Sequence, residues 1–121
     1  MSGKILVVDG LATNRIFLKV KLATAYYEVI QAANGAEALS LAQRERPDLI
    51  LLSARLPDQR GSDFLTALKG RLGRETPPAI MFLTEDNSQT RLDALKAGAA
   101  EILVKPVDEQ VLLARLRSLL R

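Results

Sequence analysis

The amino-acid sequence predicts an α/β fold in which helices cover both faces of a parallel β-sheet. Three observations indicate this fold class. Short, almost continuously apolar runs rich in Val, Ile and Leu recur along the 121 residues, segments with helical spacing lie between them, and the connections are only a few residues long. Near-continuous apolarity suits strands that are buried on both faces, and right-handed crossovers then place helices on both sides of the sheet.

The first half of the chain contains three expected strands and two expected helices. Residues 4–8 and 48–52 are apolar runs, whereas residues 27–33 alternate more, which is typical of an edge strand. Apolar residues four apart predict one face of the first helix. These pairs are Ile16 with Val20 and Leu18 with Leu22. Asn34 is expected to begin the second helix as its cap, and Pro47 to end it. The apolar face of that helix is Ala38, Leu39 and Ala42.

The second half continues the alternation, with strands expected at residues 79–83 and 102–104. Ser62 and Ser88 are expected to cap the third and fourth helices. The third helix should bury Phe64, Leu65, Leu68 and Leu72, and the fourth Leu92 and Leu95. The fifth helix, at residues 108–120, carries Val111, Leu112, Leu116, Leu119 and Leu120.

Composition excludes several classes of function. The chain has no Cys and no His, which removes disulfides, thiolate nucleophiles and the usual zinc ligands. The apolar runs are far shorter than the roughly 20 residues of a membrane span, and the first residues do not resemble a signal peptide, so we expect a cytoplasmic protein with no membrane contact. Basic residues are spread along the chain, and three Phe, two Tyr and no Trp offer little stacking surface, so we expect no direct nucleic-acid binding.

Polar residues follow four of the expected strands. Asp9 and Gly10 follow the first strand, Ser53 the third, Thr84 the fourth and Lys105 the fifth. In open parallel sheets the functional crevice lies at the carboxyl ends of the strands. We therefore expect the functional site there.

Four stretches around these positions resemble the receiver domain of bacterial two-component response regulators. They are "KILVVDG", "DLILLSARLPDQRG", "IMFLT" and "GAAEILVKP", in the order and spacing of that family. The resemblance covers essentially the whole chain and implies a single (βα)5 flavodoxin-like domain, residues 1–121, with strand order 2-1-3-4-5. The stretch "LATAYYEVIQAANGAEAL" also resembles the first receiver module of regulators with two receivers and a diguanylate cyclase output domain. Because nothing here resembles an output domain, we expect the N-terminal module of a longer protein.

In receiver domains a histidine kinase phosphorylates an aspartate after the third strand, with Mg²⁺ held by that aspartate and two further acidic residues. The resemblance implies roles for positions that match the family. Asp9 matches the first acidic residue, Thr84 and Lys105 the residues that contact the phosphoryl group, and Pro57, Gly61 and Pro106 the loop residues and the proline that often follows a cis peptide bond.

Three positions depart from the family pattern. Gly10 replaces the second acidic residue, Ser53 the phosphorylated aspartate, and Ile102 the aromatic residue that reports phosphorylation. Mg²⁺ needs carboxylates to offset its dehydration, so with Asp9 alone we expect weak or no binding and no other cofactor. Lys105 is expected to pair with Asp9.

The leading hypothesis is therefore a non-catalytic receiver that takes up no phosphoryl group and acts as an adaptor or dimerisation module. Its expected partners are a second receiver, an output domain or a histidine kinase, with a possible homodimer through the fourth helix, fifth strand and fifth helix. Two alternatives remain: phosphorylation of another residue such as Asp58, or an unrelated flavodoxin-like enzyme or ligand-binding domain. Arg55 and Arg60 beside the site leave open that the emptied pocket binds an anion or a partner.

Overall fold

A computed structural model describes residues 3–120 and contains one five-stranded parallel sheet in the order β2-β1-β3-β4-β5. This confirms the predicted fold class and strand order. The strands are β1 (Lys4–Val8), β2 (Glu28–Ala32), β3 (Leu49–Ser53), β4 (Ala79–Leu83) and β5 (Glu101–Val104). The helices are α1 (Ala12–Thr24), α2 (Gly35–Glu45), α3 (Gly61–Leu72), α4 (Ser88–Ala97) and α5 (Glu109–Leu119), with a short 3-10 helix at Gly73–Glu75.

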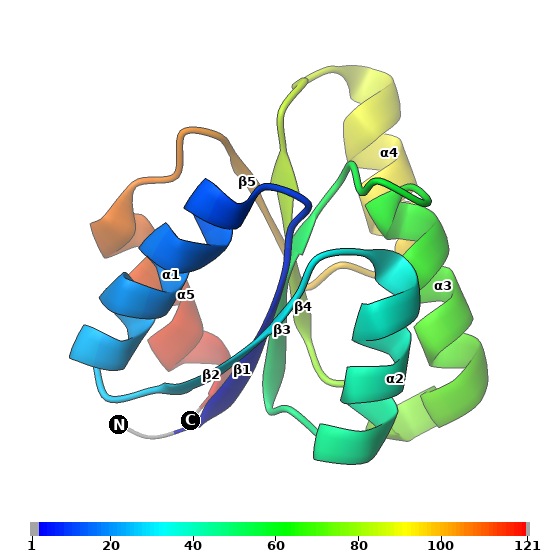
Figure 1. The fold of residues 1–121 in the computed structure, drawn as a ribbon. Coiled ribbons are helices and arrows are strands. Elements are labelled where there is room, and N and C mark those ends of the chain that lie inside the picture. The colour runs from blue at the N-terminus through cyan, green and yellow to red at the C-terminus, as the bar shows by residue number, and fades with distance from the viewer. Residues whose placement is uncertain (1–2, 121) are drawn as a thin grey trace.

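The sheet lies between two helical layers, with α1 and α5 on one face and α2, α3 and α4 on the other (Figure 1). Alternate residues of the central strands enter two separate hydrophobic cores. Leu6 and Ile50 pack with Phe64 under α2–α4, whereas Ile5 and Leu51 pack with the buried residues of α1 and α5. β1, β3 and β4 are therefore apolar at successive positions, while β2 at the sheet edge is only partly buried.

The predicted inward faces of α1 and α4 are partly wrong. Leu18 and Leu22 of α1 are buried as expected, but Ile16 and Val20 are 59% and 57% exposed. α4 buries its alanines, and its two leucines face outward. The buried residues are Ala94 and Ala97, and the exposed ones are Leu92 and Leu95. Small side chains let α4 pack closely on the sheet, so its larger residues remain at the surface.

Asn34 caps α2 as predicted, since its side chain accepts the Glu37 amide hydrogen at 2.8 Å. The predicted Ser62 and Ser88 caps are wrong. α3 begins at Gly61 with no side-chain cap, and α4 is capped by Asn87, which accepts from the Thr90 amide at 2.9 Å and forms a capping box with that residue. Asn87 directly precedes Ser88, and its capping box with Thr90 makes Asn87 the cap and Ser88 the first helical residue.

No helix within residues 3–120 is both long enough and apolar enough to cross a membrane.

Candidate functional site

The sheet topology brings Asp9, Ser53 and Lys105 together at the carboxyl ends of three strands. Ser53 is the last residue of β3, and Asp9 and Lys105 directly follow β1 and β5. Asp9 and Ser53 are each only 3% exposed, and they are the only polar or charged residues within 3–120 that are buried. Residues far apart in sequence therefore form one enclosed polar cluster.

Both oxygens of the Asp9 carboxylate accept hydrogen bonds from nitrogen donors. The Leu11 amide donates to Oδ1 at 2.9 Å, and the Asn14 side chain donates to Oδ2 at 3.2 Å. Lys105 Nζ also donates to Oδ2, at 3.2 Å. This contact is a largely buried ion pair and confirms the predicted pairing of Lys105 with Asp9. A buried carboxylate needs such a partner, because its desolvation is otherwise strongly unfavourable.

Lys105 links Asp9 to Ser53. Its Nζ donates to the Ser53 hydroxyl oxygen at 3.3 Å as well as to Asp9. An ammonium group has three donors, so one remains for another acceptor. The Lys105–Pro106 peptide bond is cis, as the resemblance implied.

A second cation, Arg15, lies against the same cluster and was missed by the sequence analysis. Its Nη1 donates to the backbone oxygen of Asp9 at 2.7 Å. A side-chain contact with a backbone oxygen has no sequence signature, and an arginine in an exposed helix is usually solvated. Arg15 thus places a second positive charge beside the Asp9–Lys105 pair without pairing with the Asp9 carboxylate.

The space beside Gly10 is filled by the loop between β3 and α3. A Cβ atom added to Gly10 would lie 2.9 Å from Cδ and Cγ of Pro57. That separation is shorter than real Cβ contacts, so any side chain at position 10 requires the proline ring to move. The Pro57 ring therefore occupies the space into which a side chain at position 10 would extend.

Asp58, the alternative phosphorylation site, holds this loop against α2. Its carboxylate accepts the Gly35 amide hydrogen at 2.8 Å and that of Ala36 at 3.0 Å. The Gly35 amide is the main reason why the pKa of Asp58 lies below its usual value. The Asp58 side chain thus faces the start of α2, and it does not line the depression that contains Ser53 and Lys105.

Gly61 permits the close approach of α3 to the end of β3. A Cβ atom at this position would lie 2.4 Å from the backbone oxygen of Ser53, and the Gly61 amide donates to the Ala54 oxygen at 2.8 Å. Because the obstacle is backbone, no side-chain rearrangement could accommodate a larger residue. Gly61 therefore fixes the position of the loop that carries Pro57 and Asp58.

Thr84 and Ile102, on the other side of the site, are less constrained. Thr84 is exposed and lines the same depression as Ser53 and Lys105, and within residues 3–120 its hydroxyl makes no hydrogen bond with the protein. Ile102 is partly buried and packs against the core under α2–α4.

The donor set does not fit Mg²⁺, which requires an octahedral shell of oxygens. Asp9 is the only carboxylate that lines the depression, and both of its oxygens accept hydrogen bonds from nitrogen. Residues 3–120 contain no cluster of three or more acidic, His or Cys side chains that could hold a metal ion.

The chain matches a known protein family and is similar in sequence to several of its members. The family model described as the response regulator receiver domain matches residues 5–117. The response regulator PleD of Caulobacter vibrioides is 39% identical over 121 residues, which are 100% of this chain and 27% of that protein. The transcriptional regulatory protein KdpE of Mycobacterium tuberculosis is 37% identical over 117 residues, covering 97% of this chain and 50% of that protein. The chain thus spans about a quarter to half of the length of these curated relatives.

Solved structures give the same result. The chemotaxis protein CheY4 of Vibrio cholerae superposes with a TM-score of 0.91 at 32% identity, covering 99% of this chain and 100% of that chain. The BeF3-activated N-terminal receiver domain of RstA from Klebsiella pneumoniae gives a TM-score of 0.89 at 29% identity, covering 98% of both chains. The chain therefore belongs to the response regulator receiver domain family of two-component signalling.

Proposed function

We propose that this receiver domain works without Mg²⁺ and without phosphoryl transfer, as a protein-interaction module. The observation that carries the proposal is the position of the Lys105 ammonium, which bonds to both Asp9 and Ser53. In an active receiver, by contrast, Mg²⁺ bridges the acidic residues and an aspartate attacks the phosphoryl group. Here a protein cation already balances the remaining carboxylate, so no metal is needed for charge balance.

The chemistry of Ser53 supports the same conclusion. A serine hydroxyl becomes a good nucleophile only when a positioned base takes its proton. Lys105 donates to the Ser53 oxygen, and the Asp9 oxygens are occupied by other donors, so the neighbours of Ser53 do not supply that base. A phosphoserine would also be a stable ester and not the labile acyl phosphate of a self-resetting switch.

Acetyl phosphate with Mg²⁺, followed by intact-mass measurement, tests the proposal. We expect no stoichiometric, acid-labile gain of one phosphoryl group. Such a gain would overturn the proposal, and the same measurement on an Asp58→Asn variant would then locate it. Loss of the gain in that variant would identify Asp58 as the acceptor, and its retention would eliminate Asp58.

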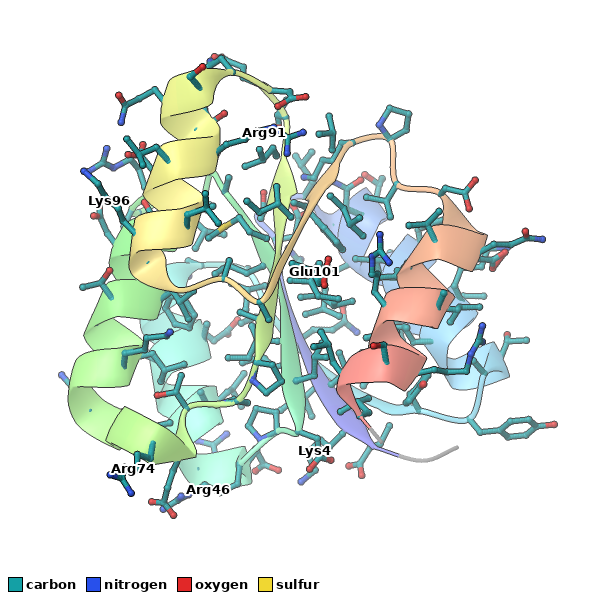
Figure 2. All side chains as sticks on the ribbon, turned by 180° about the vertical axis from the view of Figure 1, so that it is seen from behind. Lys4, Arg46, Arg74, Arg91, Lys96 and Glu101 are labelled. Atoms are coloured by element: carbon teal, nitrogen blue, oxygen red, sulfur yellow. The ribbon has the colours of Figure 1, made fainter. Side chains whose placement is uncertain are left out.

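The face formed by α4, β5 and α5 is the proposed interaction surface. Leu92, Leu95 and Val111 are 42%, 62% and 41% exposed on its two helices. Charged groups lie on the same face: Lys96 points outward from α4, and Glu101 lies on the side of β5 nearest α5 (Figure 2). Arg115 holds Glu101 at 3.3 Å. Exposed apolar residues within a charged rim are typical of protein interfaces.

We propose a homodimer through this face, with a second receiver, an output domain or a histidine kinase as further partners. Because this chain covers only part of its relatives, we also propose that it is the N-terminal module of a longer protein. Sedimentation velocity on a Leu95→Glu variant tests the dimer, with Val20→Glu on α1 as the matched control. Leu95→Glu should be monomeric at concentrations where the native chain and the control are dimeric. A monomeric native chain, or a dimer lost only in the control, would contradict this surface.

A further inference from the structure

Two depressions in the surface both border the Asp9–Lys105 pair. The first has a volume of about 360 Å³ and contains Ser53 and Thr84. The second has a volume of about 450 Å³ and extends from the same ion pair toward α1 and the segment after β5. Its apolar walls are Phe17, Leu18, Phe82, Pro106 and Val107. Small-ligand sites commonly have volumes of about 300–1,000 Å³, with apolar walls and a few convergent polar groups.

We propose that this site binds a small organic carboxylate with an aryl or alkyl body. The carboxylate would bind to Lys105, and the apolar body would lie between Phe17 and Pro106. The inference rests on the proposed function, because a pocket that held Mg²⁺ and a phosphoryl group would have no room for such a ligand at Lys105.

The charge of the cluster favours an anion. Lys105 and Arg15 both contact Asp9, which is the only carboxylate that lines either depression. No carboxylate within residues 3–120 lies at ion-pair distance from Arg15. Arg15 therefore adds a positive charge beside the balanced Asp9–Lys105 pair, although it lines neither depression, and the third Lys105 N–H is available to an acceptor. A ligand carboxylate would neutralise the excess charge with a charge-assisted hydrogen bond.

The apolar walls distinguish an organic carboxylate from inorganic phosphate. Phe17 is 51% exposed although it borders the depression, so its ring has apolar surface that a ligand could cover. Lys21 lies 5.6 Å from the centre of that ring, which helps to hold Phe17 in place. Phosphate would engage only the polar part of the site and leave this surface in water.

Titration of the ¹⁵N-labelled 121-residue chain with 4-phenylbutyrate tests the proposal by NMR. We expect saturable amide shifts at Asp9, Leu18, Phe82 and Val107, with a Kd in the millimolar range or below. The uncharged 4-phenylbutanamide and inorganic phosphate should each bind at least about fivefold more weakly. The amide lacks the negative charge that binds Lys105, and phosphate lacks the apolar body that packs on Phe17. A Lys105→Gln variant should bind 4-phenylbutyrate and 4-phenylbutanamide equally well.

Phe17→Ala provides a second test that does not depend on the buried ion pair. We expect it to weaken 4-phenylbutyrate binding at least about threefold, whereas Tyr26→Ala, which truncates a different exposed aromatic residue, should leave it unchanged. Equal binding of acid and amide, shifts at other residues, or no effect of Phe17→Ala would overturn the inference. Phosphorylation of the chain by acetyl phosphate would instead overturn the proposed function, so the two failures are separable.

Discussion

The two sides of the site differ in how firmly they are held. On the β1–β3 side, Asp9 accepts three hydrogen bonds, Pro57 covers Gly10, and Asp58 ties the loop to the start of α2. On the β4–α4 side, Thr84 is exposed and its hydroxyl makes no hydrogen bond within residues 3–120.

This difference indicates which part of the site is firmly held by hydrogen bonds within the protein. On the side that would receive the metal, hydrogen bonds within the protein hold the Asp9 carboxylate and the loop that carries Asp58. The side that would report phosphorylation keeps an exposed hydroxyl and a helix whose leucines face solvent. We infer that the first side is a fixed structural element and that any remaining response lies on the second side.

Gly61→Ala should produce the largest loss of stability, about 3 kcal/mol in the free energy of unfolding. The added Cβ atom would meet the Ser53 backbone oxygen, which cannot move aside without shifting the strand end. Urea unfolding measures the effect. Gly70→Ala is the matched control in the same helix, because a Cβ atom there meets nothing within 4 Å. That variant should be more stable by about 0.5–1 kcal/mol, and equal behaviour of the two variants would contradict the close packing of the loop.

Lys105→Met should lower the free energy of unfolding by about 2–3 kcal/mol, because it leaves Asp9 without its cation in a largely buried site. Adding Asp9→Asn should recover part of this loss, and a double-mutant cycle should give a coupling of at least about 1 kcal/mol. Additive effects would mean that the two groups are close without being coupled.

Mg²⁺ binding should return only when the pocket is rebuilt and the loop is loosened. We expect no Mg²⁺-dependent shift in melting temperature for the native chain, a small shift for Ser53→Asp with Gly10→Asp, and a larger one when Pro57→Ala is added, since Pro57 blocks position 10. Saturation to ten times the Kd would stabilise the chain by about 1.4 kcal/mol. Equal shifts in the native chain and the triple variant would refute this account of the pocket.

Asp58→Asn should have a smaller, pH-dependent effect. The amides of Gly35 and Ala36 keep the pKa of Asp58 below its usual value, so its contribution to stability is present above the unfolded-state pKa of about 3.9 and is lost as the pH falls through the lower folded-state value. The native chain should therefore unfold a few degrees higher than the variant at pH 7, and the gap should shrink as the pH falls below the unfolded-state pKa of about 3.9.

The matched control for this measurement is Glu75→Gln, which changes an exposed carboxylate paired with Arg46 at 3.5 Å. Its melting temperature should stay close to that of the native chain at both pH values. A gap for Asp58→Asn that does not change with pH would show that its carboxylate does not hold the loop.

Thr84→Ala should have the smallest effect, within about 0.5 kcal/mol of the native chain, because its exposed hydroxyl makes no hydrogen bond within the described residues. Chemical unfolding provides the measurement. A decrease of more than about 1 kcal/mol in the free energy of unfolding would show that Thr84 stabilises the fold as the groups on the β1–β3 side do.

The sheet and the central ion pair could be predicted from sequence for a clear physical reason. Strands buried on both faces must be apolar at successive positions, and parallel strands bring their carboxyl ends to one edge, where Asp9 and Lys105 meet. The outward position of Ile16 and Leu95 could not be predicted, because helical spacing identifies apolar stripes without showing which one meets the sheet. The contacts of Arg15 and Asp58 were also missed, since both join a side chain to backbone atoms whose positions depend on the complete fold.

The family match also argues against the alternative of an unrelated flavodoxin-like enzyme or ligand-binding domain. Any small-molecule site in this chain would therefore be a modification of a receiver pocket.

The contact between Gly10 and Pro57 limits how the acidic site can be restored. With the proline ring 2.9 Å from the position of a Cβ atom, an acidic residue at position 10 requires the Pro57 ring to shift. A change that loosens the loop has to come first or together with it, and Ser53 must change as well. Restoring the acidic site therefore requires changes at both Gly10 and Ser53, together with a shift of the Pro57 ring to make room.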